Sequence, residues 1–367
     1  MNKLVFANLL HRPLRSIISV LAVAIEVIMI LSIVGIFMGM LNDQRARTNG
    51  IGADLMMMGS GASMFNSLSS ASMPVNDATA LRRLPHVAVV SPAIQHTVTT
   101  PSSIEIIWGI DYKTFDALKP FVFLAGGPFK GPDDAIVDSV LAGADHLHVG
   151  DTISVLDRPF RISGIVEPGK GGRTLLPIET MGQLMGAAGK ASVFYIKCDN
   201  PSDENLVTEE IHSTPGLHDA EVWSIEQWLN QMTPNKVPGF NIAVRAVTGI
   251  AVIVGFLVIF QAMYTAVLER TREIGILKSM GASKAAIMSV VLRECGVLAI
   301  AGVVLGIAGT FGVRVLIFHL WPTQHFEITA RWAALGAGIA FAGAICGALY
   351  PAWMAARKDP IDALAYE

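Results

Sequence analysis

The stretch from Ser16 to Asn42, SIISVLAVAIEVIMILSIVGIFMGMLN, decides the fold class, because Glu26 is the one charged residue in it. A helix of about 20 apolar residues crosses the hydrocarbon core of a bilayer, so this stretch is long enough to span a membrane. It is longer than the apolar part of a secretory signal, and no small-residue cleavage pattern follows it. The stretch therefore predicts an uncleaved membrane helix.

The composition of the whole chain agrees with a membrane protein. Of its 367 residues, 52% are apolar and 16% are charged, and the mean hydropathy is +0.51. The net charge of −3 leaves no basic field that would hold nucleic acid. The three cysteines, Cys198, Cys295 and Cys346, are too far apart for a disulfide framework or a CxxC zinc site.

Three further apolar runs predict a multi-pass protein with four transmembrane helices and a large α+β domain between the first two. The first charge-free run is Ala246–Leu268, and two more follow it. The predicted order is an N-terminal segment (1–15), helices at 16–42, 242–268, 288–318 and 332–356, the large domain (43–241), a short connection (269–287), an external loop (319–331) and a C-terminal tail (357–367).

The distribution of basic residues predicts the orientation of these helices. Ten lysines and arginines flank one side, including Arg270, Arg272 and Lys278 between the second and third spans, and six flank the other. Because cytoplasmic flanks carry the excess of positive charge, both termini and the 269–287 connection are predicted to be cytoplasmic and the large domain extracytoplasmic.

The large domain has the composition of a folded α+β module. Short β-rich runs separated by turn residues predict its strands, at Val87–Val90, Thr97–Thr100, Ile104–Trp108, Thr152–Leu156, Phe160–Val166, Leu175–Ile178 and Val193–Lys197. Helical patterns occur at Asp77–Leu84, Ser202–Ser213 and Ser224–Met232. The Met-, Gly- and Ser-rich segment Met56–Met73 is interpreted as either a mobile flap or an irregular loop.

The connection between the second and third spans, LERTREIGILKSMGAS (Leu268–Ser283), carries the most specific pattern. It is expected to continue the second span as a charged helix, with Ile274, Leu277 and Met280 on one apolar stripe. Gly281 suits a helix stop, and Ser283 can cap the next helix. The stripe either lies in the membrane interface or docks into a groove of a cytoplasmic partner.

Two motifs resemble those of the FtsX-like, or MacB-type, ABC transporter permeases. One is the run from Glu269 to Ala282, ERTREIGILKSMGA, and the other is the C-terminal run from Pro351 to Glu367, PAWMAARKDPIDALAYE. Four spans with one large external domain between the first and second are also similar to this family, so the resemblance covers essentially the whole chain.

The resemblance implies a permease that dimerises, with itself or with a similar chain, and that binds two copies of an ATP-binding subunit. ATP and magnesium would then bind to that subunit, with no cofactor bound by this chain. ATP-driven motion would pass to the external domain, a mechanism called mechanotransmission. The resemblance further implies a bacterial inner-membrane location and a possible periplasmic adaptor.

The resemblance also assigns residues to the expected contact with the ATPase. The coupling residues would be Glu269, Arg270, Arg272, Glu273, Ile274, Gly275, Leu277, Lys278, Gly281 and Ala282. The C-terminal motif, with Arg357, Asp359, Pro360 and Leu364, would lie near the same surface. The expected function is export or extraction of a hydrophobic or amphipathic cargo; the alternative is a transducer that transports nothing and regulates an envelope enzyme.

Glu26 and two glycines are the candidate functional residues inside the membrane. At helical rise Glu26 lies roughly 16 Å beyond Arg15, near the middle of a bilayer, where an unpaired carboxylate is costly. It is interpreted either as a group for substrate contact or gating at a dimer interface, or as a neutral carboxyl hydrogen-bonded between helices. Gly35 and Gly39 form a GxxxG motif that suits close packing, within a subunit or between two.

Other catalytic readings are weak. The run from Gly164 to Gly171, GIVEPGKG, nearly fits a phosphate-binding P-loop but has glycine where a magnesium-binding hydroxyl is needed. His146 and His148 have no further metal ligand at a familiar spacing. Neither a GxSxG nor an HExxH motif occurs, so the chain is not expected to be an enzyme.

Overall fold

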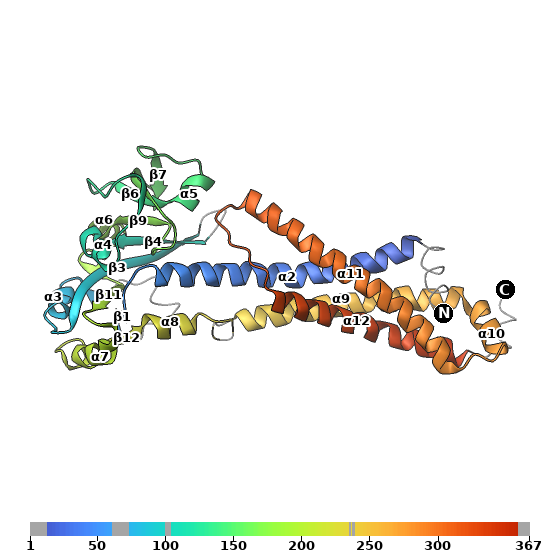
Figure 1. The fold of residues 1–367 in the computed structure, drawn as a ribbon. Helices are drawn as coiled ribbons and strands as arrows, with labels where there is room; N and C mark the ends of the chain where they lie inside the picture. Colours follow the sequence, from blue (N-terminus) through green and yellow to red (C-terminus); the bar gives the residue numbers. More distant parts are fainter. Residues whose placement is uncertain (1–12, 61–72, 100–103, 235, 237–238, 359–367) are drawn as a thin grey trace. The chain divides into compact units, whose positions relative to one another are not determined.

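A computed structural model describes residues 13–60, 73–99, 104–234, 236 and 239–358. The chain forms two compact units (Figure 1). We call the first the membrane unit, which lies within Met1–Gly39, Pro238–Leu320 and Gln324–Glu367. The second, the head unit, lies within Met40–Val237 and Trp321–Thr323.

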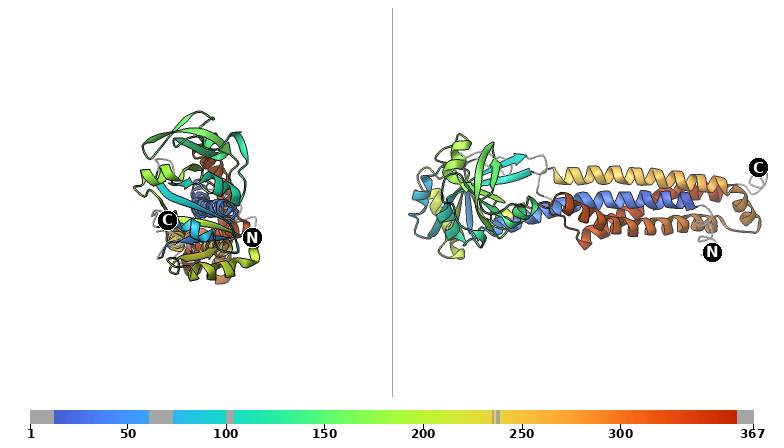
Figure 2. Two further views of the ribbon diagram at one scale, coloured as in Figure 1. Left: turned by 90° about the vertical axis from the view of Figure 1, so that its left-hand side faces the viewer. Right: turned by 90° about the horizontal axis from the view of Figure 1, so that it is seen from above.

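Among its described residues, the membrane unit is built from four long apolar helices and one short helix. The long helices are α2 (Pro13–Asn49), α9 (Phe240–Glu269), α11 (Lys284–Leu320) and α12 (Ala330–Arg357), and each is long and apolar enough to cross a membrane. The short helix α10 (Thr271–Ser279) joins α9 to α11. These helices, with the large domain between α2 and α9, confirm the predicted fold class. The long helices lie alongside one another (Figure 2).

Glycines bring α2 and α11 into close contact. A Cβ atom added to Gly302 would lie 2.6 Å from the Cβ of Val23, and one added to Gly306 would lie 2.6 Å from the Cβ of Val27. Lipid gives helices no hydrophobic reason to associate, so such close backbone approach is a main source of packing energy. The GxxxG motif of α11 therefore serves packing within one chain.

Gly35 and Gly39 of α2 also pack within the chain. A Cβ atom on Gly35 would lie 2.8 Å from the ring of Phe326, and one on Gly39 would overlap the backbone carbonyl of His325. The backbone N–H of Glu327 donates to the Gly35 carbonyl at 3.0 Å. Because the segment before α12 covers both glycines, the structure favours packing within a subunit over packing between two.

The head unit contains a mixed ten-stranded sheet in the order β12-β1-β11-β3-β4-β9-β6-β8-β5, with β7 also paired to β8. Its strands are β1 (Leu55–Met58), β3 (Val87–Thr99), β4 (Ile104–Ile110), β5 (Phe123–Gly126), β6 (Asp134–Asp138), β7 (Thr152–Val155), β8 (Arg158–Val166), β9 (Thr174–Pro177), β11 (Val193–Cys198) and β12 (Glu221–Ser224). A second, two-stranded sheet pairs β2 (Met73–Pro74) with β10 (Lys190–Ala191). Most pairs are antiparallel, whereas β4–β9 and β6–β8 are parallel.

Short helices complete the head unit. They are α3 (Asp77–Leu81), α4 (Tyr112–Leu118), α5 (Ser139–Ala144), α6 (Ile178–Leu184), the 3-10 turn η1 (Pro201–Asp203), α7 (Glu204–Ser213) and α8 (Ile225–Gln231). A capping box fixes the start of α8, because the Ser224 hydroxyl accepts from the backbone N–H of Gln227 and the Gln227 side chain accepts from the backbone N–H of Ser224.

Strand β1 lies in the interior of the sheet, between β11 and β12. Its four residues are all buried: Leu55 and Met57 pack into the apolar cluster on one face, and Met56 and Met58 into the cluster on the other. A strand buried on both faces reads as a continuous apolar run rather than an alternating one. The flap or loop interpretation of Met56–Met73 is therefore wrong for Met56–Met58; residues 61–72 lie outside the described residues.

Candidate functional site: a charged elbow, an enclosed carboxyl and a head anchor

The connection between α9 and α11 is an elbow, which we define as residues 270–283. Helix α9 ends at Glu269, and Arg270 has the non-helical dihedral angles φ −107° and ψ 17° that separate it from α10. The buried Thr271 hydroxyl bonds back to the carbonyls of Leu268, at 2.7 Å, and Val267, at 3.2 Å. These bonds satisfy carbonyls that the helix end leaves without intrahelical donors. The expectation that α9 continues into the connection as one helix is wrong.

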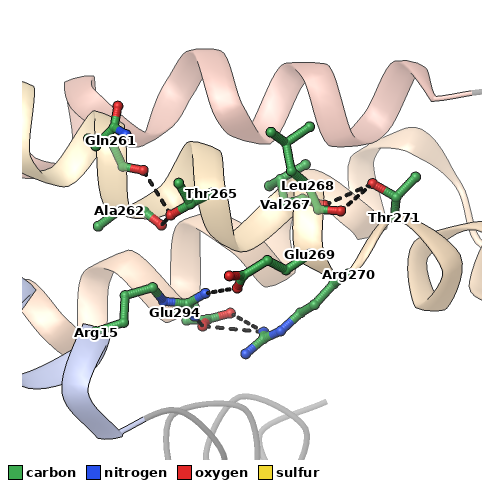
Figure 3. A network of polar contacts seen from close by, with 10 residues as sticks. All are labelled: Arg15, Gln261, Ala262, Thr265, Val267, Leu268, Glu269, Arg270, Thr271 and Glu294. Carbon is green, nitrogen blue, oxygen red and sulfur yellow. Dashed lines mark hydrogen bonds and ion pairs between the residues drawn. The ribbon is translucent and has the colours of Figure 1, made fainter. Parts of the chain in front are cut away.

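Four charged side chains meet at the base of the elbow (Figure 3), three from helices α2, α9 and α11 and one from Arg270 between α9 and α10. We call them the base cluster. Glu294 of α11 lies between two guanidinium groups, with Arg270 Nη1 at 3.1 Å and Arg15 Nη2 at 3.3 Å. Arg15 Nη1 also lies 3.5 Å from Glu269 Oε2. The Glu294 side chain is 5% exposed, against 42% for Glu269. The cluster ties the N-terminal end of α2 and the end of α9 to α11.

Helix α10 has one face against its own chain and one face to solvent. Ile274 is 8% exposed and Leu277 packs beside it, both in the apolar core of the membrane unit. Ile276 and Met280 are 44% and 71% exposed. Met280 follows the last residue of α10, so it does not continue the line of Ile274 and Leu277. The single outward apolar stripe predicted from these three residues is therefore wrong.

The exposed side of the elbow consists of other residues than the apolar stripe predicted from the sequence. We define the docking face as Arg272, Glu273, Ile276 and Met280, which are exposed. Sequence reasoning missed Ile276 in the stripe, because spacing alone does not say which face of a short helix packs on its own protein. The docking face combines two apolar side chains with one charge of each sign.

The remaining residues that were predicted for coupling close the elbow. Lys278 Nζ donates to the Ala356 carbonyl at 3.1 Å and to the Lys358 carbonyl, so it caps the C-terminal end of α12. Gly281 has a φ of +93°, which favours glycine, and the Ala282 N–H bonds to the Leu277 carbonyl at 3.0 Å. The Ser283 hydroxyl accepts from Ala286 N–H at 3.2 Å. The predicted helix stop and cap are confirmed.

Part of the C-terminal motif can be placed. The Arg357 guanidinium lies 4.3 Å from the centre of the Trp353 ring, a cation–π contact at the end of α12. The other residues of the motif, Asp359, Pro360 and Leu364, lie outside the described residues. Whether they lie near the docking face stays a prediction.

Glu26 is enclosed by helices of its own chain. Its residue is 3% exposed, and neither carboxyl oxygen has a hydrogen-bond partner among the described residues. Its neighbours include Gly255 of α9 and Gly343 of α12. The carboxyl therefore does not lie on a surface that a second subunit could contact, which corrects the dimer-interface placement, and the expected hydrogen bond between helices is absent among the described residues.

The head unit holds the end of α2 through a group of buried and partly buried charged residues that we call the head anchor: Asp43, Arg47, Asp138 and Arg173. Arg47 Nη2 donates to Asp138 Oδ2 at 2.8 Å, and Arg47 Nε donates to Asp43 Oδ2 at 2.9 Å. Arg173 Nη2 donates to the same Asp43 oxygen, at 3.1 Å, and to the Thr323 carbonyl at 2.9 Å. Sequence reasoning missed these residues, because they are separated by up to 130 positions.

The loop that resembled a P-loop has a structural role. Gly164 lies within β8, and Lys170 points inward, where its Nζ donates to the Phe115 carbonyl at 2.9 Å and to the Lys119 carbonyl. Its Nζ also lies 3.9 Å from the centre of the Phe121 ring. The lysine therefore caps the C-terminal end of α4, the reverse of a phosphate-binding geometry, in which it would point away from the loop toward an anion.

The fold defines a multi-pass membrane protein with a large α+β domain between its first two membrane helices. Residues 16–214 match the family of the MacB-like periplasmic core domain, and residues 245–360 match the FtsX-like permease C-terminal family. The chain belongs to the MacB-like, FtsX-like permease family, as the two sequence motifs indicated.

Named relatives agree with this membership. The macrolide export ATP-binding/permease protein MacB of Shewanella sp. (strain ANA-3) is 25% identical over 395 residues, which cover 97% of this chain and 59% of that protein. The uncharacterized ABC transporter permease YknZ of Bacillus subtilis (strain 168) is 37% identical over 129 residues, 34% of this chain and 31% of that protein. The chain thus spans 59% of the length of the MacB relative.

A solved structure is also similar to part of the chain. The crystal structure of the periplasmic region of MacB from Actinobacillus actinomycetemcomitans covers 50% of this chain and 94% of its own, at 16% sequence identity and a TM-score of 0.38.

Proposed function

We propose that this chain is the membrane subunit of an ATP-driven ABC system of the MacB type. Two copies of an ATP-binding subunit bind the docking faces of a permease dimer, and ATP hydrolysis moves the head by mechanotransmission. The work done is export or extraction of a hydrophobic or amphipathic cargo. The family membership and the name of the Shewanella relative support export as the activity.

The main observation behind this proposal is that one side of the elbow packs against the membrane unit while the other side is exposed. Ile274 and Leu277 hold α10 to the core of the membrane unit, and Lys278 ties it to the end of α12. A force on the exposed Ile276 and Met280 therefore acts on the helices rather than on a loose loop. Elements with many buried contacts move as bodies, which is what a coupling segment needs.

The second support is the length and anchoring of α2. This helix of 37 residues runs without a break from Pro13 to Asn49, roughly 55 Å at helical rise. Arg15 near its beginning belongs to the base cluster, and Asp43 and Arg47 near its end belong to the head anchor. One continuous helix thus carries buried ion pairs at each end, the construction expected of a rod that passes on motion.

Docking is tested by replacing the apolar part of the docking face. The double variant Ile276→Asp, Met280→Asp should lose the ATP-binding subunit during purification of the tagged chain in mild detergent, because two charges would replace the apolar contact. Leu206→Asp in the head is the matched control, since Leu206 and Ile276 are both 44% exposed. Equal recovery of the ATPase with both variants would refute the docking face.

Transmission is tested separately from docking. Asp43→Asn removes the charge that both Arg47 and Arg173 contact, while the elbow is untouched. This variant should retain the ATPase but lose most of the stimulation of ATP hydrolysis by cargo. Amphipathic compounds that stimulate hydrolysis by the purified complex in liposomes support export; activation of a copurifying envelope enzyme without such stimulation would replace export by the regulatory role.

A further inference from the structure

The strongest unexplained feature of the chain is the side chain of Glu26, about a third of the way along α2. Both carboxyl oxygens are fully buried and have no hydrogen-bond partner among the described residues. A carboxylate has about four acceptor positions, and folded proteins satisfy nearly all such buried groups. An acidic group in this state needs a ligand that the protein itself does not supply.

The space that the carboxyl occupies is formed by the absence of a side chain at Gly255, with Gly343 nearby. A Cβ atom on Gly255 of α9 would overlap Glu26 Oε2, and one on Gly343 of α12 would lie 3.8 Å from Oε1. Gly255 therefore has no room for a side chain while the carboxyl occupies its position. The fit links the carboxyl directly to the distance between α2 and α9.

Nothing charged faces Glu26 from the helices around it. Apart from Glu26 itself, charged residues are absent from α2 between Arg15 and Asp43, from α9 between Arg245 and Glu269, from α11 between Glu294 and Arg314, and from α12 between Arg331 and Arg357. The other titratable groups in these intervals are two thiols and two phenols, those of Cys295, Cys346, Tyr264 and Tyr350. The Cys295 thiol donates to the Ala344 carbonyl at 3.3 Å, and Cys346 and Tyr350 are exposed on the helix surface.

A fully buried carboxylate without a counter-ion or a hydrogen-bond donor from the protein is strongly disfavoured in the interior of a membrane protein. The smallest ligand that removes the charge is a proton, and a proton fits the volume between the two glycines. The sequence alone left open whether the carboxyl contacts a substrate or a second subunit, or is neutral and hydrogen-bonded between helices. The enclosure by Gly255 and Gly343 and the lack of donors favour the neutral acid.

We propose that Glu26 is a proton-binding site whose occupancy is coupled to the packing of α2 against α9 and α12. The carboxyl holds its proton while the helices are packed. When α9 moves away, water enters, the O–H bond breaks, the electron pair stays on the carboxylate and the proton passes to water. This inference goes beyond the proposed function, because it requires neither the ATPase nor a cargo.

Infrared spectroscopy of the full chain in lipid nanodiscs at pH 7 tests the protonation state. A protonated carboxyl absorbs in a region separate from carboxylates and amides. The wild-type chain should show such a band, and Glu26→Gln, which has nearly the same shape as the neutral acid, should lack it. Loss of carboxylate absorption in Glu26→Gln, with no change in the protonated band, would overturn the proposal.

A pair of glycine variants on one helix tests the coupling to packing. Gly255→Ala places a methyl group where the carboxyl lies, whereas Gly249→Ala adds a methyl group that meets nothing within 4 Å. Gly255→Ala should convert the protonated band into carboxylate absorption, and Gly249→Ala should keep the wild-type spectrum. A folded Gly255→Ala chain with the wild-type band would overturn the coupling. If that chain does not fold, the double variant Glu26→Ala, Gly255→Ala should restore folding, because it removes the carboxyl that the added methyl group overlaps; failure to restore it would overturn the coupling, and the Glu26→Gln test still decides protonation.

Discussion

At the scale of single residues, Lys170 shows how a buried charge can serve structure. It is 9% exposed, and its ammonium group lies among carbonyls and rings at the end of α4. Burial lowers the pKa of Lys170 to about 8, with Lys119 and Lys197 adding to the effect and Asp116 opposing it. The folded head thus gives up this proton at a lower pH than an unfolded lysine does.

The pKa shift of Lys170 predicts a pH dependence of stability. Between pH 8 and 10.5 the unfolded chain binds more protons at this position than the folded chain, so the free energy of unfolding should rise with pH, by up to about 3 kcal/mol. Below pH 8 the effect is constant. Denaturant unfolding of the purified chain, followed by tryptophan fluorescence, should show this rise in the wild type and a smaller rise in Lys170→Met. Parallel pH profiles would contradict the prediction.

Replacing Glu294 by the similarly shaped glutamine should have a large effect on stability. Glu294→Gln leaves Arg15 and Arg270 facing a neutral amide in a site where the acidic side chain is 5% exposed, so it should destabilise the membrane unit by about 3 kcal/mol. Glu269→Gln is the control: that side chain is 42% exposed, and its loss should cost less than about 1 kcal/mol. Thermal unfolding in detergent measures both, and similar melting temperatures for the two variants would argue against a structural base cluster.

Whether the role of one of these residues could be predicted from the sequence depends on how far away in the sequence its partners are. Gly281 and Ser283 were predicted correctly, because a helix stop and a cap depend on neighbours within four positions. Glu294 could not be recognised, since its partner Arg15 is 279 positions away. Glu26 was recognised as unusual because a charge in an apolar run can be seen in the sequence. That two glycines of other helices lie next to it can be seen only in the structure.

At the scale of elements, the glycine contact between α2 and α11 allows a matched test. An added methyl group at Gly306 would lie 2.6 Å from the Val27 Cβ and 2.9 Å from the Ala24 carbonyl, whereas one at Gly312 would meet nothing within 4 Å. Gly306→Ala should therefore separate the helices and cost about 1 to 3 kcal/mol. Gly312→Ala should leave thermal stability unchanged or slightly raised. Equal stability of the two variants would show that α2 and α11 do not depend on this contact.

The elements themselves were predicted unevenly. The four long helices follow from composition, since about 20 apolar residues in a row have few alternatives to a membrane span. In the head, β8 and β11 were predicted nearly to their ends, but β5, β6 and β12 were missed. These strands have four or five residues, too few for a period of two to be distinguished. Of the predicted strand Thr97–Thr100, the residues up to Thr99 belong to the long strand β3, and Thr100 lies outside the described residues.

At the scale of the whole molecule, the sequence predicts the side of the membrane on which each part lies. The elbow and both termini follow the excess of basic residues and should be cytoplasmic, whereas the head between α2 and α9 should be outside. The proposed function requires this arrangement, because ATP is available in the cytoplasm. A reversed chain would place the docking face where no ATPase could reach it.

Two single-cysteine positions test this topology, because the native thiols give a low background. Burial raises the pKa of Cys198 to about 12, and the residue is 3% exposed, so this thiol should not react. Cys346 lies in the apolar interval of α12, away from a water-soluble reagent.

Ser202→Cys in the head and Ser279→Cys in the elbow both replace exposed serines. A membrane-impermeant maleimide should label Ser202→Cys in spheroplasts. It should label Ser279→Cys in inverted vesicles but not in spheroplasts, because a folded head cannot cross back through the bilayer. Labelling of Ser279→Cys in spheroplasts would reverse the orientation and remove the physical basis for a cytoplasmic ATPase acting on the elbow.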